Sequence, residues 1–188
     1  GHAASPEQAL NPIPLLLRYL DKLTHHIWEQ KPGDFAPSHL EVTSIDVDNP
    51  ITNVIPSRAE ARANIRFHIQ HTSEDIIRQV QTWATEMSSD LSVECVPNGE
   101  AFLCQDTRVT HALEKAIQSV MNIMPRYSTG GGTTDGRFVA AHCPVIEFGM
   151  VCNTIHHKNE RIPVADCDNL TKIYEAFLEN YFLEHDTL

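Results

Sequence analysis

The sequence predicts an α/β protein in two parts, residues 1–100 and residues 101–188. Helical and strand-like hydrophobic periods alternate through the first part. In the second part, a glycine-rich run and a nearly all-apolar segment interrupt the helical patterns, as in proteins whose helices cover a sheet. The turn-forming residues Pro97, Asn98 and Gly99 stand where the character of the chain changes.

The first part predicts helix, strand, strand, helix and strand. Apolar spacing places the first helix within residues 6–30, beginning near Pro12 and Pro14 because proline is tolerated only in a first turn. Ser73 can cap the second helix with its hydroxyl. The remaining elements are strands at 40–47 and 58–69, a helix at 73–87 and a short strand at 91–96.

This order is one strand short of the ferredoxin-like β-α-β-β-α-β unit. The missing strand would precede Gly1, because the chain opens on a helix. We therefore expect residues 1–100 to form a ferredoxin-like domain that lacks its first strand.

The second part predicts helices at 106–121, 137–142 and 166–182 and a strand at 145–150. The strand is almost entirely apolar, which suits a strand covered on both faces in a parallel or mixed sheet. One or two strands and three helices cannot close such a sheet. We therefore expect this part to be incomplete as well.

Composition excludes several classes of protein. The chain carries 14 basic and 25 acidic residues, a formal net charge of -11. Such a surface repels phosphate, so nucleic acid and anionic membranes are not expected partners. The apolar stretches are far shorter than the roughly 20 residues of a membrane span. Five cysteines without CxxC spacing predict a reducing, cytoplasmic location and mostly buried thiols.

The run from Thr129 to Arg137 is the most informative stretch for chemistry. Its three glycines expose backbone N–H groups, and Arg137 can bind a carboxylate or phosphate with two parallel hydrogen bonds. The run lacks the lysine of a phosphate-binding nucleotide loop. It predicts either an anion site or a tight turn in which Thr134 or Asp135 caps the next helix.

The loop at 152–160 follows the apolar strand and holds His156 and His157. A neutral imidazole is a common zinc ligand, although most isolated histidines are structural. Neighbouring side chains diverge, so one of the pair is a candidate ligand and its partners come from elsewhere. Arg66 lies on the polar face of its predicted strand. Taken alone, it indicates only a solvated surface charge.

Several segments together resemble a known family. They are Gly1-His2-Ala3-Ala4, Asn53-Val54-Ile55-Pro56, Asn64-Ile65-Arg66-Phe67, the run Thr129 to Phe138, Val145 to Gly149 and Thr154-Ile155-His156. In this order and spacing the chain resembles the C-terminal half of members of the dinuclear-zinc aminoacylase/carboxypeptidase family. Within that family, the GGGT-x-DGRF pattern indicates the branch that hydrolyses N-succinyl-LL-2,6-diaminopimelate.

The resemblance implies a two-domain, homodimeric zinc hydrolase. Residues 1–100 would be its lid and dimerisation domain without the first strand, and residues 101–188 the returning part of its catalytic domain. A full-length enzyme would hold two zinc ions per active site. It would release succinate and LL-2,6-diaminopimelate in lysine and diaminopimelate biosynthesis.

The resemblance also implies roles for individual residues. His156 matches the one zinc ligand that this half supplies, and His2 matches a histidine that reaches across the dimer to stabilise the oxyanion. Cys152 stands where the family usually has a substrate-binding asparagine, next to Asn153. The residues expected to bind substrate carboxylates are Asn53, Arg66, Gly132, Thr133, Arg137 and Asn153.

Two alternatives remain open at this point. A related metallo-deacylase, such as an acetylornithine deacetylase, shares the general pattern. A stand-alone dimerisation module would pair with a second copy and perform no chemistry.

The other metal ligands and the general base would lie upstream of Gly1, so we expect the isolated chain to bind zinc weakly and to hydrolyse nothing.

Overall fold

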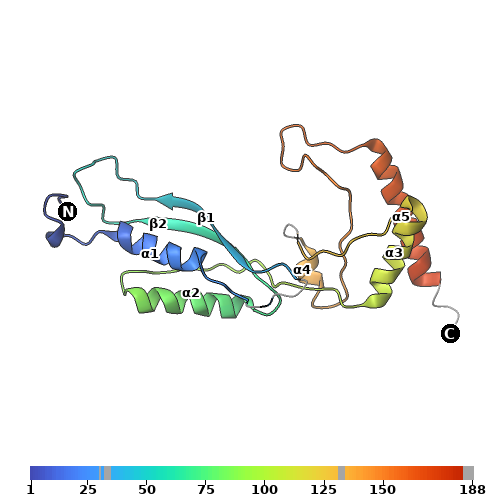
Figure 1. Cartoon of the computed structure of the whole chain (residues 1–188), viewed down its shortest axis with the longest axis horizontal. Helices are drawn as coiled ribbons and strands as arrows, with labels where there is room; N and C mark the ends of the chain where they lie inside the picture. Colours follow the sequence, from blue (N-terminus) through green and yellow to red (C-terminus); the bar gives the residue numbers. More distant parts are fainter. Residues whose placement is uncertain (30, 32–34, 131–133, 184–188) are drawn as a thin grey trace. The chain divides into compact units, whose positions relative to one another are not determined.

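The computed structural model describes residues 1–29, 31, 35–130 and 134–183 (Figure 1). It divides into two compact units, Gly1–Ala101 and Phe102–Leu188, and each is described by itself. Helices and a pair of strands confirm the predicted α/β class. The elements are a 3-10 turn at Pro6–Gln8, α1 (Pro12–Thr24), β1 (His39–Asp46), β2 (Glu60–Arg66), α2 (Ser73–Met87), α3 (Thr107–Met121), α4 (Gly136–Val139) and α5 (Val164–Leu183).

In unit 1, β1 and β2 form a two-stranded antiparallel sheet. His39 pairs with Arg66 at one end, and Asp46 pairs with Glu60 at the other, next to the loop that joins the strands. Side chains alternate between the two faces of a strand, so Leu40 is buried while its neighbour His39 is exposed. Both strands lie where the alternation predicted them, although β2 is shorter than the predicted range.

Helix α1 begins at Pro12, as expected, because the side chain of Asn11 accepts the N–H of Ile13 at 3.1 Å. It ends at Thr24, six residues before the end of the predicted segment 6–30. The N–H of His25, the residue after the helix, donates to the carbonyl of Asp21 at 3.1 Å and so satisfies a carbonyl of the last turn.

Helix α2 begins at the predicted residue but with a different cap. Thr72, not Ser73, is the N-cap: its hydroxyl accepts the N–H of Asp75, whose carboxylate accepts the N–H of Thr72 in return. The hydroxyl and N–H of Ser73 both donate to the carboxylate of Glu100 instead. The prediction that Ser73 caps the helix is therefore wrong.

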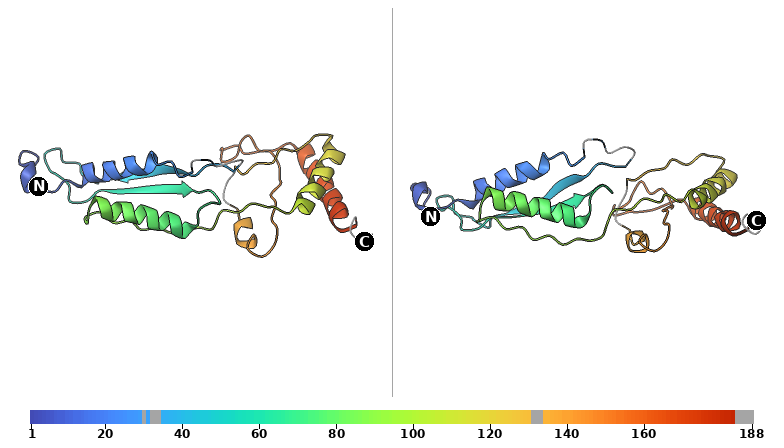
Figure 2. Two further views of the ribbon diagram at one scale, coloured as in Figure 1. Left: turned by 60° about the horizontal axis from the view of Figure 1, so that its bottom comes forward. Right: turned by 90° about the horizontal axis from the view of Figure 1, so that it is seen from below.

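The core of unit 1 lies between the helices and the sheet. Figure 2 shows α1 and α2 side by side over one face of the β1–β2 sheet. The Tyr19 hydroxyl donates to the carbonyl of Val80 at 2.7 Å, and burial, with a contribution from Cys95, raises the pKa of Tyr19 to about 12. The buried cluster consists of Tyr19, Leu23, Leu40, Val80, Trp83 and Ala84.

Residues 91–96 do not form the predicted strand. Leu91, Val93 and Cys95 pack against the core of unit 1, so every second side chain of this segment faces inward. A strand also needs a neighbour for its backbone hydrogen bonds. Among the described residues β2 pairs only with β1, and the carbonyl of Val93 accepts from the side chain of Gln81 at 3.4 Å.

Unit 2 is built on the contact between α3 and α5. Asp106 caps α3 by accepting the N–H groups of Arg108 and Val109, and Asn122 ends the helix in a left-handed conformation with φ 54°. Both helices lie where the sequence predicted them. Their shared core consists of Leu113, Ala116, Ile117 and Ile173.

The predicted strand at 145–150 is also absent from the described residues. Ile146 and Phe148 pack against the core of unit 2, and the carbonyl of Phe148 accepts the hydroxyl of Tyr174 at 2.6 Å. This carbonyl is thus satisfied by a side chain and not by a neighbouring strand. The parallel or mixed sheet expected here is therefore not present in the described part of the chain.

Among the described residues, no helix combines the length and the apolar character needed to cross a membrane.

Candidate functional site

His2 and Asn53 are brought together by a short antiparallel contact in unit 1. His2 forms an isolated bridge with Val54, and the N–H of Ala3 donates to the carbonyl of Asn53 at 2.9 Å. Gly1 and Ile55 exchange two backbone hydrogen bonds, at 2.7 and 3.0 Å. The two residues that the resemblance assigned to the site are thus held on adjacent backbone segments, and both are exposed.

The ring of His2 has a defined tautomer in this arrangement. Its Nδ1 accepts the backbone N–H of Ala4 at 3.0 Å. A neutral imidazole has one acceptor and one donor nitrogen, so this hydrogen bond assigns the proton to Nε2. His2 can therefore donate a hydrogen bond from Nε2 without carrying a charge.

Asn49 supports this segment and was not singled out from the sequence. Its side-chain Nδ2 donates to the carbonyl of Val54 at 2.8 Å, and its Oδ1 accepts the N–H of Ile51 at 3.2 Å. Both bonds fold the loop that carries Asn53. The Asn49-Pro50 pair is a common turn signal, and it was the sequence feature that could have indicated this role.

Arg66 lies at the opposite end of the hairpin from Asn53. Asn53 is in the loop that joins β1 to β2, whereas Arg66 is the last residue of β2. The strand from Glu60 to Arg66 extends about 20 Å, at roughly 3.3 Å per residue. The structure therefore does not bring Arg66 together with His2 and Asn53 within one copy.

The chain leaves unit 1 at the end where Arg66 lies. α2 starts seven residues after Arg66, and its first residue, Ser73, binds Glu100. Glu100 immediately precedes Ala101, the last residue of unit 1. Arg66 and the connection to residue 102 thus share one end of unit 1, and His2 with Asn53 occupies the other.

The part of the glycine-rich run that the structure describes forms a turn into α4. The hydroxyl of Thr134 accepts the N–H of Gly136 at 3.1 Å, whereas the side chain of Asp135 makes no capping bond. Arg137 donates to the carbonyl of Thr134 at 2.7 Å, and its guanidinium lies 4.4 Å from the ring centroid of Phe138. Gly132 and Thr133, both predicted to bind substrate, lie outside the described residues.

Asn153 and His156 lie in one exposed loop of unit 2. His156 has φ 62°, a left-handed conformation that only a few per cent of non-glycine residues adopt. The hydroxyl of Thr154 bonds both backbone groups of Arg161 and so closes the loop. The imidazole of His156 is thus carried on a tightly closed turn.

A complete metal centre is not present within the described residues, where no three His, Cys, Asp or Glu side chains are grouped to hold an ion. An exposed imidazole fits the chemistry of a single zinc ligand. A site that includes His156 therefore requires further ligands from elsewhere.

Sequence reasoning missed a buried polar cluster in unit 1. The carboxylate of Glu29 accepts both the hydroxyl and the N–H of Ser38 and lies 3.1 Å from Nε2 of His71. Its side chain is only 1% exposed. The hydroxyl of Ser38 in turn accepts the N–H of His68. A single glutamate near the end of the helical segment predicted at 6–30 gave no signal of this role.

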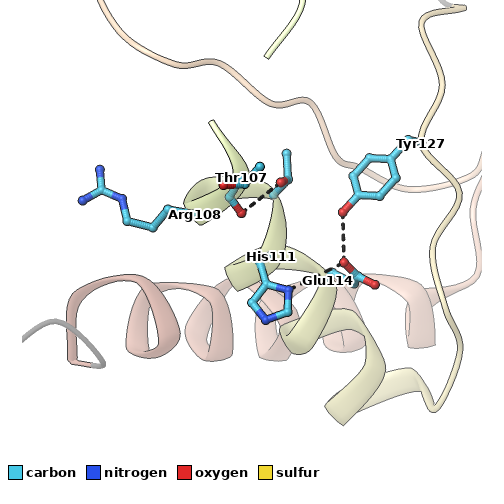
Figure 3. A pocket seen from close by; sticks show the side chains of 6 residues that line it. Thr107, Arg108, His111, Glu114 and Tyr127 are labelled. Atoms are coloured by element: carbon cyan, nitrogen blue, oxygen red, sulfur yellow. Dashed lines mark hydrogen bonds and ion pairs between the residues drawn. The ribbon is translucent and has the colours of Figure 1, made fainter. Parts of the chain in front are cut away.

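A hollow of unit 2 lies beside α3 (Figure 3). The hydroxyl of Tyr127 donates to Glu114 at 3.0 Å, and His111 lies 3.9 Å from the same carboxylate. Burial, together with the bond to Glu114, raises the pKa of Tyr127. The polar groups that line this hollow largely bond to one another. None of the residues predicted to bind substrate or metal lines it.

Comparison with known families matches residues 1–90 to the family described as the peptidase dimerisation domain. The match covers the strands and helices of unit 1 up to the end of α2.

Curated relatives are similar along nearly the whole chain. A succinyl-diaminopimelate desuccinylase from Cereibacter sphaeroides is 40% identical over 186 residues, which cover 97% of this chain and 49% of that protein. One from Rhodopseudomonas palustris is 42% identical, with coverage of 97% and 48%. The chain spans about half the length of the curated relatives it matches. These findings confirm the resemblance drawn from the sequence.

Two solved structures share the fold. The aminopeptidase PepT from Bacillus cereus has a TM-score of 0.73 at 20% identity, covering 96% of this chain and 48% of that chain. An M20 family metallo-carboxypeptidase from Sulfolobus solfataricus has a TM-score of 0.73 at 14% identity, covering 96% and 55%. At these identities the likeness concerns the fold alone.

Proposed function

We propose that this chain forms part of a metal-dependent hydrolase that cleaves the succinyl amide of N-succinyl-LL-2,6-diaminopimelate. The observation that carries the proposal is the 40–42% identity, along nearly the whole chain, to proteins named for that reaction. Water adds across the amide: the acyl carbon receives the oxygen and leaves as succinate, and the nitrogen receives a proton and leaves as LL-2,6-diaminopimelate. The product serves lysine and diaminopimelate biosynthesis.

His156 is the metal ligand that this chain would supply, and the proposed metal is zinc, with two ions in each complete site. The exposed imidazole suits that role, and the other ligands would come from outside the described residues. A bound zinc ion polarises the amide carbonyl and lowers the pKa of a bound water.

The substrate carries several carboxylates, which call for guanidinium groups and for hydroxyl or amide donors. Arg66 and Arg137 are the proposed carboxylate-binding arginines, one in each unit. Asn53 and Asn153 would donate amide hydrogen bonds to the same substrate. Gly132 and Thr133 are proposed to bind it as well, on the strength of the resemblance alone.

His2 is proposed to stabilise the oxyanion that forms on the amide carbonyl. Its bond to Ala4 leaves the proton on Nε2, so the ring can donate to the oxyanion while neutral.

The two ends of unit 1 are proposed to serve two copies of the enzyme. A span of about 20 Å along β2 separates Arg66 from the loop of Asn53, which is too far for the same substrate carboxylate. Arg66 lies where the chain continues into residue 102, so it would serve the site of its own copy. His2 and Asn53 would then reach the site of a second copy, as a dimerisation domain permits.

A cytoplasmic location is part of this proposal. The five cysteines show no CxxC spacing, which suits a reducing compartment. All five are half-buried or exposed in the structure, so the expectation of mostly buried thiols is wrong.

Substrate preference tests the proposal. The enzyme that contains this chain should hydrolyse N-succinyl-LL-2,6-diaminopimelate with a much larger kcat/KM than N-acetylornithine. A preference for N-acetylornithine would replace the proposal with a related deacylase. The match to a dimerisation domain also supports a second candidate, a module without catalysis. Zinc-dependent turnover by the enzyme would eliminate it.

A further inference from the structure

The backbone of His156 is unusual within the described residues. Only three non-glycine residues there have a positive φ: Asp48, Asn122 and His156. Aspartate and asparagine tolerate this conformation, and Asn122 uses it to end α3. Histidine is also found in this conformation more often than most residues, but His156, unlike Asn122, does not end a helix. A strained conformation of this kind persists only where the surrounding structure holds it in place.

Thr154 supplies that restraint. Its Oγ1 accepts the N–H of Arg161 at 3.0 Å and donates to the carbonyl of the same residue at 3.2 Å. One hydroxyl thus satisfies both backbone groups of Arg161 and joins the two ends of the loop. Inside the loop, the N–H of His157 donates to the carbonyl of Thr154 at 3.0 Å.

The remaining contacts fix the position of His156 itself. The carboxylate of Glu160 accepts the N–H of His156 at 3.4 Å, and the N–H of Glu160 donates to the carbonyl of His157 at 3.1 Å. Cys152 Sγ lies 3.5 Å from the Thr154 hydroxyl. Cys152 and Thr154 are half-buried, whereas His156 and Glu160 are exposed, so the threonine lies on the inner side of the loop.

We propose that Thr154 is a positioning residue whose hydroxyl closes the loop and holds His156 in the conformation that presents its imidazole to the metal. The inference rests on the proposed function for the role of His156. The restraint itself rests on the hydrogen bonds of the loop. Loss of the hydroxyl frees the N–H of Arg161 and leaves its carbonyl only the contact with Cys152 Sγ at 3.7 Å, and His156 can then relax to a negative φ.

The conformation is tested first, by NMR on this 188-residue chain. Unmodified protein should show a strong intraresidue NOE between the amide and α protons of His156, as expected for a positive φ, and slow amide exchange at Arg161. Thr154→Val should weaken the NOE and speed the exchange of Arg161 at least about tenfold. Thr154→Ser should retain both signals. Absence of either signal in the unmodified chain would overturn the proposal, even if the valine variant failed to fold.

Thr171→Val is the matched control. The hydroxyl of Thr171 also donates to a backbone carbonyl, that of Cys167 at 3.0 Å, but on α5 rather than in the loop. It should leave the signals of His156 and Arg161 unchanged. An equal effect of both variants would mean that the loop responds to general destabilisation, which contradicts the proposal.

Zinc affinity in the enzyme that contains this chain is tested second, by competition with a chelator. Thr154→Val should weaken binding about 10- to 100-fold, as expected for groups that orient a ligand, with the melting temperature of the metal-free protein unchanged. Thr154→Ser should restore the affinity. If His156→Ala weakens binding and Thr154→Val does not, the positioning role is wrong. If His156→Ala itself has no effect, the ligand assignment fails instead.

Discussion

The two units differ in how many side chains of their helices are buried against neighbouring elements. In unit 1, the 15-residue α2 buries four side chains, and a carboxylate buried among hydrogen-bond donors links three segments. In unit 2, the 20-residue α5 buries only Ile173, and Leu178 and Phe182 on the same helix remain half-exposed or more. Helices gain most of their stability in proteins by packing an apolar face. Unit 2 is therefore expected to be the less stable of the two.

Core substitutions should show this difference most clearly. Both tryptophans, Trp28 and Trp83, lie in unit 1, so their fluorescence reports that unit alone, whereas far-UV circular dichroism reports both. We expect two transitions in urea, the earlier one invisible to fluorescence. Trp83→Ala should lower the free energy of unfolding of unit 1 by about 3–5 kcal/mol. Ile117→Ala should shift only the earlier transition. One shared transition would contradict the comparison.

The buried carboxylate of unit 1 should have the next largest effect. Glu29→Gln removes the charge that faces His71 and replaces one acceptor oxygen of the pair bonded to Ser38. Urea unfolding should show a loss of about 3 kcal/mol. Glu86→Gln is the control, because Glu86 pairs with Lys22 on the surface at 3.9 Å, and it should cost less than about 0.5 kcal/mol. Equal losses would mean that Glu29 contributes nothing through its burial.

Substituting the two proposed carboxylate-binding arginines, one in each unit, compares the contributions of the two units to substrate binding. In the enzyme that contains this chain, Arg66→Ala and Arg137→Ala should each raise KM with a loss of about 1.5–3 kcal/mol in substrate binding. Arg58→Ala is the control, since Arg58 is exposed and pairs with Glu60. Steady-state kinetics measure all three. If KM is unchanged in both variants, Arg66 and Arg137 are surface charges that do not bind substrate.

The smallest effect concerns acid sensitivity of unit 1. The pKa of His26 is lowered from 6.5, mainly because burial against Trp28 and Trp83 disfavours the charged ring; His71 and Lys22 also lower the pKa and Glu29 opposes them. The unfolded chain then binds a proton that the folded chain does not, so stability is complete above pH 6.5 and falls as the pH drops through the folded pKa. His26→Gln should flatten this dependence, measured as the urea midpoint of tryptophan fluorescence. An unchanged slope would contradict the assignment to His26.

Local signals predicted most of the elements. Helical periodicity located α2, α3 and α5 within two residues, and alternation located β1 and β2. Residues 91–96 and the nearly all-apolar run 145–150 were also predicted as strands, and both strands are absent from the described residues. A side-chain pattern records which face is buried, and both segments do pack inward. It does not record whether a neighbouring strand is there to pair with.

The sequence predicted the residue types of the candidate site, but it did not predict how these residues are arranged in space. The glycine-rich run and the His156 loop stood out by residue type, and His2 came only from the resemblance. Spacing along the chain did not show that residues 2 and 53 meet through backbone hydrogen bonds, or that Arg66 lies at the other end of β2. Such proximity depends on pairing between distant segments, which the sequence encodes only through the whole fold.

Mixed dimers test most directly whether the two ends of unit 1 serve different copies. One copy carries His2→Ala and the other His156→Ala, so each is inactive with itself. If His2 acts across the dimer, a random mixture should regain about a quarter of the unmodified zinc-dependent hydrolysis of N-succinyl-LL-2,6-diaminopimelate, since half of the dimers have one intact site of two. If the mixture stays as inactive as the separate variants, His2 and His156 serve the same copy, and the account is wrong.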